Sequence, residues 1–243
     1  MNPAISLVGF LNIYNMKFLI LHSILLVIPY FLVWFAFYLF QDRTFFVRPK
    51  SYYHLDQMIA FTLITILLFF IWNSFFFEIK FLGLKIAKSS LLFDDKFITF
   101  LGVVFAVIGW LYAGRFQFIS TIKSHSIQAL MNSRLSDSYT EKFDSITKAV
   151  ERLKKTQNNK DCLTEFDNLN TQEKLDLRYV LNFYEYISIG IRNNEFDEFL
   201  LKQMMRSQLI NTFIYFEKYI EDIQKEQPTA LINLIQLAIR WKK

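Results

Sequence analysis

Cysteine and histidine are scarce in this sequence of 243 residues, which contains one cysteine and three histidines. The single thiol, Cys162, excludes an internal disulfide, and so few thiol and imidazole groups argue against a structural zinc site of the usual kind. One lone cysteine also fits a domain in a reducing compartment. We therefore expect neither a metal nor another cofactor.

Glycine is also rare, and the six glycines never cluster as a phosphate-binding loop requires. The sequence has no Walker lysine loop, no dinucleotide fingerprint, no G-x-S-x-G and no H-E-x-x-H. Arg48 and His54 have the spacing of the helical ribonuclease superfamily, but they lie in a short loop that contains a proline. We expect no catalytic residues and no enzyme activity, and a membrane-bound nuclease or lipid enzyme is the least favoured alternative.

Acidic residues are scarce in the first half of the chain. Before position 120 there are nine Lys and Arg against five Asp and Glu, a net charge of +4, whereas the remainder has 18 against 17. A nearly neutral second half gives no strong signal of nucleic-acid binding. The chain is 53% hydrophobic with 28 phenylalanines, whereas soluble domains are typically about 45–50% apolar. The additional hydrophobic residues are concentrated in the first half.

Three long apolar runs occupy that first half, at 18–40, 57–77 and 98–119. The first has 23 residues, which would rise about 34 Å as a helix and so cross a hydrocarbon core of about 30 Å. We predict an N-terminal segment over 1–17, a transmembrane region over 18–119 embedded in the lipid bilayer, and a cytoplasmic all-α domain over 120–243. Six basic residues against five favour placing the tail inside the inner (plasma) membrane.

Two sets of residues share a helix face within these runs. The second run has a polar stripe that consists of Thr62, Thr65 and Asn73. The third run has a face of small residues that consists of Gly102, Ala106, Gly109 and Ala113. The polar stripe either lines a pore or faces a neighbouring subunit, or it forms hydrogen bonds between the chain's own helices. Small residues let helix backbones approach closely, so we expect a packing partner and favour a homo-oligomer.

Beyond residue 119 the apolar residues follow the period of water-soluble helices. Ser138 with Glu141, and Asn170 with Glu173, have capping-box spacing. The second box predicts a helix that ends near Asn193, and further helices follow over about 197–226 and from Pro228 onwards. No segment alternates like a strand, so the predicted fold class is all-α, with three transmembrane helices followed by a cytoplasmic helical bundle.

The segment RYVLNFYEYISIGI, residues 178–191, is apolar but contains charged and amide side chains. On a helix its polar residues form one stripe with the next arginine, and this polar seam consists of Arg178, Asn182, Glu185 and Arg192. The spacing allows Asn182 to contact Glu185, and either arginine to reach the carboxylate. We interpret the polar seam as a structural or interface feature, because no second catalytic group accompanies the carboxylate.

The sequence VLNFYEYISIGI, followed by FDEFLLKQMMRSQLINTFIYFEKYIEDI and Trp241, resembles an uncharacterised family of prokaryotic membrane-anchored proteins. Their helical tails contain an L-N-x-x-E core and an apolar G-I pair, matched here by Leu181, Asn182, Glu185, Gly190 and Ile191. Some members look distantly akin to the membrane accessory proteins of type VI-B CRISPR systems and to abortive-infection membrane proteins. The three predicted spans depart from the one or two that are usual.

This resemblance implies antiphage defence, a helical domain related to the ribonuclease superfamily without its active site, and an oligomeric pore. The expected function is therefore a membrane-anchored defence accessory or effector that oligomerises and perturbs or permeabilises the inner membrane. The alternative is a tether or regulator that forms no pore, whose cytoplasmic helical domain binds a partner defence protein.

Overall fold

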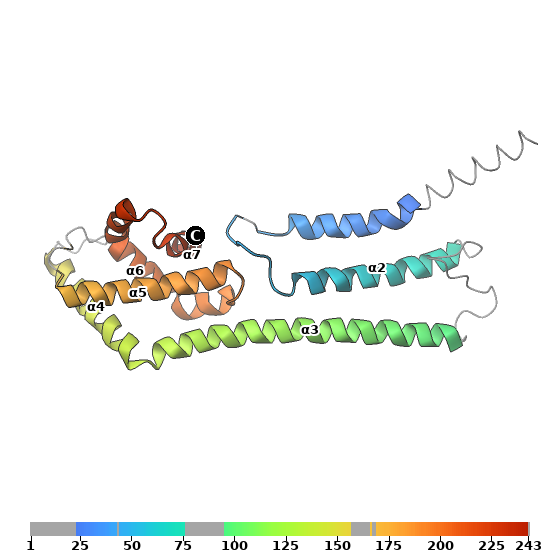
Figure 1. The fold of residues 1–243 in the computed structure, drawn as a ribbon, viewed down its shortest axis with the longest axis horizontal. Coiled ribbons are helices and arrows are strands. Elements are labelled where there is room, and N and C mark those ends of the chain that lie inside the picture. The colour runs from blue at the N-terminus through green and yellow to red at the C-terminus, as the bar shows by residue number, and fades with distance from the viewer. Residues whose placement is uncertain (1–22, 43, 76–94, 157–165, 167–168, 243) are drawn as a thin grey trace, which may run out of the picture. The chain divides into compact units, whose positions relative to one another are not determined.

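The computed structural model describes residues 23–42, 44–75, 95–156, 166 and 169–242. Every regular element in these residues is a helix, which confirms the all-α fold class for the described part of the chain (Figure 1). An apolar helix over Ser23–Leu39 comes first. The labelled helices follow it and are α2 (Tyr53–Phe75), α3 (Asp95–Arg134), α4 (Asp137–Thr156), α5 (Thr171–Arg192), α6 (Glu198–Glu226) and α7 (Ile232–Lys242).

The chain divides into two compact units. The first contains residues 1–41 and 52–117, and the second, which we call the tail domain, contains residues 42–51 and 118–243. Residues 42–51 fall within the predicted transmembrane region, but the structure groups this short segment with the tail domain. The boundary after residue 117 lies close to the predicted one after residue 119.

Two helices of the described residues are long and apolar enough to cross a membrane. They are Tyr53–Ile71, with 19 residues, and Leu101–Ser133, with 33 residues, and few of these residues are buried. The described part of the first predicted span, Ser23–Leu39, is apolar but shorter than these two. The three-span prediction is therefore supported for two helices, while residues 1–22 and 76–94 lie outside the described part.

Specific contacts join the helices of the first unit. The Tyr30 hydroxyl lies 2.7 Å from Thr65 Oγ1, which links the helix Ser23–Leu39 to α2. Arg115 of α3 forms an ion pair with Asp56 of α2, and its guanidinium lies 5.2 Å from the centre of the Tyr52 ring. The charge of Arg115 is therefore neutralised by a carboxylate of the neighbouring helix.

The core of the tail domain lies around α5. One face of this helix is fully buried and consists of Leu177, Val180, Leu181, Tyr184, Ile187 and Ile191. Helices α4 and α7 pack against α5, and α7 also packs against α6. Trp241 of α7 is completely buried, so the end of the last helix is part of this core. Apolar residues at helical spacing bury one face of each helix, which is the main source of tail stability.

The helix boundaries test the predicted capping signals. Asn170 and Glu173 form the predicted capping box at the start of α5, which ends at Arg192 as expected. The predicted box at Ser138 is wrong, because α4 begins at Asp137 and its cap is the Ser136 hydroxyl, which accepts from the Tyr139 N–H at 3.4 Å. The expectation that Pro228 opens the last helix is also wrong, since α7 begins at Ile232.

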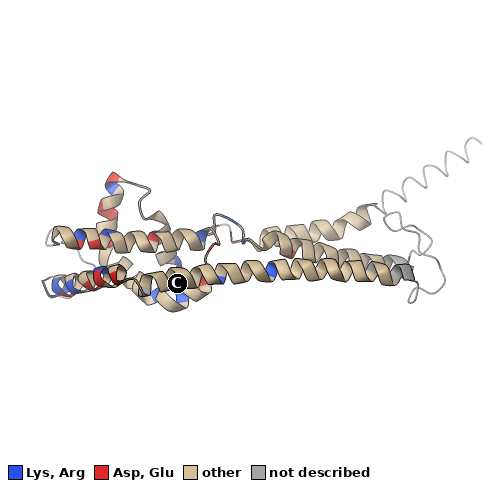
Figure 2. Cartoon of the chain, turned by 60° about the horizontal axis from the view of Figure 1, so that its bottom comes forward, with Lys and Arg blue, Asp and Glu red and all other residues tan. Residues whose placement is uncertain are grey.

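Helix α3 belongs to both units. The predicted third span ends at residue 119, but the helix continues without a break to Arg134, and its last turns bury Ala129, Leu130 and Ser133 in the tail domain. Figure 2 shows that charged residues are frequent on the tail helices and nearly absent from α2 and the first part of α3. One unbroken helix therefore contains both an apolar stretch and part of the tail core.

Candidate functional site

A carboxylate of α5 lies at the amino end of α7. Glu185 is half-buried, and it accepts hydrogen bonds from the Asn233 backbone N–H at 3.3 Å and the Leu234 N–H at 2.7 Å. These are the second and third residues of α7, whose N–H groups have no partner within the helix. The preceding residue, Leu231, has a φ of 57° and no polar side chain. Glu185 therefore supplies the cap that α7 lacks, and the helix dipole favours its negative charge.

Arg192 connects this cap to the segment between the first two apolar helices. Its Nη1 donates to the Asn233 side-chain oxygen, while the Asn233 amide nitrogen donates to Glu185. The Arg192 Nε donates to the Phe45 carbonyl at 3.1 Å, and the Arg192 carbonyl accepts from the Val47 N–H at 2.9 Å. The side chain and backbone of one residue thus fix residues 45–47 against α5.

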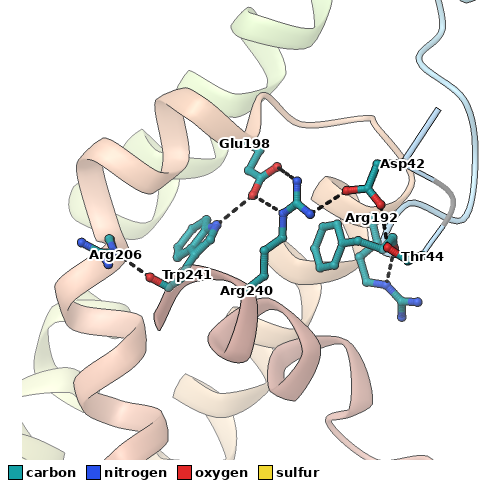
Figure 3. A network of polar contacts seen from close by, with 8 residues as sticks. Asp42, Thr44, Arg192, Glu198, Arg206, Arg240 and Trp241 are labelled. Carbon is teal, nitrogen blue, oxygen red and sulfur yellow. Dashed lines mark hydrogen bonds and ion pairs between the residues drawn. The ribbon is translucent and has the colours of Figure 1, made fainter. Parts of the chain in front are cut away.

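Arg240 of α7 makes the second connection to this segment (Figure 3). Its guanidinium donates to Glu198 at 2.8 and 3.3 Å and to Asp42 at 2.8 Å. The same guanidinium lies 4.4 Å from the centre of the Phe45 ring, within cation–π range. Glu198 also accepts from the Trp241 indole N–H at 3.1 Å. Arg240 therefore joins α6, α7 and the segment before α2.

The charges of this network stabilise one another. The Thr44 hydroxyl, and after it the Arg240 guanidinium, donate hydrogen bonds to Asp42 and lower the pKa of that carboxyl. The hydrogen bond to Glu198 is the main reason why the pKa of Arg240 is raised. Both groups remain charged at neutral pH. The network therefore holds α6, α7 and the segment before α2 together through paired charges.

Residues 42–48 were not expected to belong to the tail domain. We call them the anchored segment, because Arg192 and Arg240 hold it and the Asn194 side chain donates to the Arg48 carbonyl. Asn194 has a left-handed φ of 57°, which turns the chain sharply after α5. Nothing in the local sequence indicates these contacts, because each joins residues that are about 150 or more positions apart.

The predicted polar seam divides into two pairs. Glu185 and Arg192 both take part in the network through Asn233. Arg178 and Asn182 are exposed, and neither makes a hydrogen bond or an ion pair within the described residues. The expected contact between Asn182 and Glu185 is therefore not formed there. The physical reason is that Glu185 turns towards α7, where backbone N–H groups satisfy it.

The G-I pair has a packing role. Ile191 is fully buried, and Gly190 lies directly against the Phe196 ring, where an added Cβ would overlap the ring carbons. The Gly190 carbonyl accepts from the N–H groups of Glu195 at 2.8 Å and Phe196 at 3.1 Å. Glycine is thus required because the chain folds back onto α5 immediately after the helix ends.

The two predicted faces of the apolar helices have different environments. The Thr62 hydroxyl donates to the Met58 carbonyl, and the Thr65 hydroxyl donates to the Phe61 carbonyl, both at 2.8 Å. Both hydroxyls are therefore satisfied within the chain, and the side chain of Asn73 lies outside the described part. The small-residue face is exposed in α3, as shown by Gly102, Ala106, Gly109 and Ala113. A Cβ added at Gly102 or Gly109 would meet no atom within 4 Å.

A small cavity in the tail domain has apolar and uncharged polar lining residues. It has a volume of about 140 Å³ and lies between α3, α4 and α6, where it is lined by Leu130, Ser133, Tyr139, Thr140, Phe143, Met205 and Gln208. The nearby Tyr184 is buried, and this burial raises its pKa, so the phenol stays protonated. Among the described residues no group of three or more His, Cys, Asp or Glu side chains could hold a metal.

Comparison with known families identifies the family to which this chain belongs. Residues 96–241 match the model of a family described as a domain of unknown function, DUF4760. The chain belongs to this family. No curated protein and no solved structure matches the sequence. The DUF4760 region begins with the first turn of α3 and ends at Trp241, so it includes one apolar candidate span together with the helical tail.

Proposed function

We propose that this DUF4760 protein is a membrane-anchored defence accessory that self-associates in the inner membrane and perturbs the bilayer when a partner defence protein engages its cytoplasmic tail. The observation that supports it most directly is helix α3, which is apolar and exposed over much of its length and then enters the tail core. The matched family region contains both parts. An anchor and a tail that share one helix are suited to act together.

The open small-residue face of α3 supports self-association. Its glycines and alanines would let a second helix approach closely, and no described atom lies near a Cβ built at Gly102 or Gly109. Lipid tails are as apolar as leucine, so helices in a membrane associate mainly by such close packing. This face is therefore the proposed contact between copies of the chain within the bilayer.

The tail network supports a role in binding and assembly. Glu185, Arg192 and Arg240 are occupied by structural hydrogen bonds, and the cavity of the tail domain has no charged lining residue. General acid–base chemistry requires a group that can exchange a proton at a substrate. The resemblance of the L-N-x-x-E tail to defence-associated membrane proteins gives the proposed biological setting.

Dye release from liposomes tests the proposal. The purified full-length chain is reconstituted with and without the product of a neighbouring gene, and leakage is expected to rise when both are present. Gly109→Leu should lower leakage and oligomer yield while the tail stays folded, whereas Val103→Leu, at an exposed position outside the small-residue face, should change neither. A tight bilayer at every dose with the partner present would exclude membrane permeabilisation.

The second candidate is a tether or regulator that forms no pore. It is favoured by Thr62 and Thr65, whose hydroxyls each donate to a carbonyl of their own helix and are therefore already bonded within the chain. Affinity purification distinguishes the two functions. One stoichiometric partner without a homo-oligomer indicates a tether, and a homo-oligomer that releases dye indicates the membrane-perturbing accessory.

A further inference from the structure

The cavity of the tail domain has a buried floor and an exposed rim. Four of its lining residues are 9% exposed or less and form the floor, and these are Leu130, Ser133, Tyr139 and Met205. Thr140 and Gln208 are exposed and form the rim, so the cavity opens to solvent. Its volume is about 140 Å³. An engineered protein cavity of about 150 Å³ holds one benzene molecule, so a single ring is the size of ligand that fits.

The walls of the cavity favour an aromatic ligand. The rings of Tyr139 and Phe143 both line it, and they are stacked with their centres 5.9 Å apart and their planes at 17°. Helix α6 contributes the Met205 thioether to the same lining. Aromatic rings pack favourably against further rings, and a thioether sulfur makes favourable contacts with ring edges. A flat ring therefore gains more from these walls than an aliphatic group of the same size.

The lining also favours a neutral ligand. None of the described lining residues is charged. An ionised ligand would lose part of its hydration on entering the cavity and would find no opposite charge on those residues to compensate. We therefore expect a neutral molecule in preference to a carboxylate or an amine.

The Ser133 oxygen on the floor is a buried acceptor. Its hydroxyl donates to the Leu130 carbonyl at 2.7 Å, and no described residue donates a hydrogen bond to the Ser133 oxygen. A serine hydroxyl has one donor and two acceptor lone pairs, so the lone pairs remain for a ligand. The Thr140 hydroxyl at the rim likewise donates to the Ser136 carbonyl, at 3.2 Å. Because both protons are used within the chain, the ligand has to supply the donor.

We infer that this cavity binds a small neutral aromatic molecule with one hydrogen-bond donor, of the size of phenol. Its donor bonds to the Ser133 oxygen, and its ring packs against Tyr139, Phe143 and Met205. The cavity is lined by α3, α4 and α6, so a bound ring contacts three helices of the tail domain. Binding to the folded state alone stabilises it, so the tail should resist unfolding better as the phenol concentration rises. This site is independent of the proposed membrane function.

Methyl NMR of the full-length chain in lipid nanodiscs tests the site with phenol as the probe. The methionine methyl groups are labelled with ¹³C, and Met205→Leu identifies the signal of Met205. The ring of bound phenol should shift this signal to a saturating value. Met58, an exposed residue of α2, is the control for phenol that dissolves in the lipid, and its signal should not saturate with the same midpoint. A Met205 signal that stays in place, or never saturates, would show a cavity that holds only water and would overturn the inference.

A pair of ligands tests the hydrogen bond to Ser133. Fluorobenzene has the ring of phenol but no donor. Ser133→Ala should weaken phenol binding several-fold and leave fluorobenzene binding unchanged. Ser188→Ala is the matched control, because Ser188 is also buried and donates to a carbonyl of its own helix, that of Tyr184 at 2.6 Å. This control should change neither affinity. Equal losses for both ligands in Ser133→Ala would contradict the hydrogen bond.

Two further ligands test the chemical class. Cyclohexanol has a hydroxyl donor on a ring of similar size that is not aromatic, and it should bind several-fold more weakly than phenol. Benzoate is aromatic but charged, and it should not shift the Met205 signal. Cyclohexanol binding as tightly as phenol would overturn the preference for an aromatic ring, and benzoate binding as tightly would overturn the preference for a neutral molecule.

Discussion

The Glu185 carboxylate accepts the Leu234 backbone N–H at 2.7 Å, so a side chain of α5 caps helix α7. This contact explains why a glutamate stands in the middle of a largely apolar segment. A helix terminus with unpaired N–H groups is stabilised by an anionic acceptor. The L-N-x-x-E glutamate therefore has a structural role in the tail, and its replacement should affect folding before any chemical step.

Glu185→Ala is expected to loosen α7. Loss of a helix cap costs about 0.5–2 kcal/mol, and the α7 amides should exchange with deuterium correspondingly faster. Asn182→Ala is the control, because its side chain is exposed and makes no hydrogen bond within the described part of the chain. If Glu185→Ala abolishes function while α7 keeps its full protection from exchange, the carboxylate has a working role beyond capping.

Gly190→Ala should destabilise the tail domain by about 1–3 kcal/mol, because the added methyl group overlaps the Phe196 ring. Denaturant unfolding of the detergent-solubilised chain measures the loss. Phe196→Ala alone leaves a cavity, but it also makes room for the methyl group. The double variant should therefore lose less stability than the two single losses combined. Additive losses would show that the ring is not the obstacle.

Acid should weaken the start of α5 through Glu173. The hydrogen bond from Arg152 is the main cause that lowers the pKa of this carboxyl below its ordinary value of 4.5. A depressed folded pKa adds stability that is fully present above the unfolded pKa, and this stability disappears as the pH falls through the folded pKa. Unfolding measured at about pH 7 and about pH 3 should show a smaller pH dependence for Glu173→Gln than for the natural chain. An identical dependence would contradict this account.

Arg240→Met should release the anchored segment from the tail domain. Methionine keeps part of the apolar stem but removes the hydrogen bonds to Asp42 and Glu198. The Val47 N–H, which donates to the Arg192 carbonyl, should then exchange faster. Arg240→Lys is expected to rescue only partly, because an ammonium cannot reproduce the planar fork of the guanidinium. The matched control is Lys225→Met, which removes only an exposed pair with Asp222. Equal protection of Val47 in both variants would argue against this anchor.

The local sequence was sufficient for features that depend on neighbouring residues. The capping box of Asn170 and Glu173 and the end of α5 were predicted because their hydrogen bonds join residues three or four positions apart. The local sequence was insufficient at α4 and α7, where residues other than the predicted ones determine where the helix begins. Ser136 competes with Ser138 as a cap, and α7 takes its cap from Glu185 on another helix. Local spacing contains no information on such a distant acceptor.

Residue type and helical period are local properties, and they were enough to predict a helical protein with its apolar residues concentrated in the first half and one apolar face on α5. Three features could not be predicted in this way. Glu185 caps α7, residues 42–48 belong with the tail domain, and Arg178 and Asn182 remain outside the network. Each of these depends on which helices meet in the folded chain, and packing among residues distant in sequence sets that arrangement.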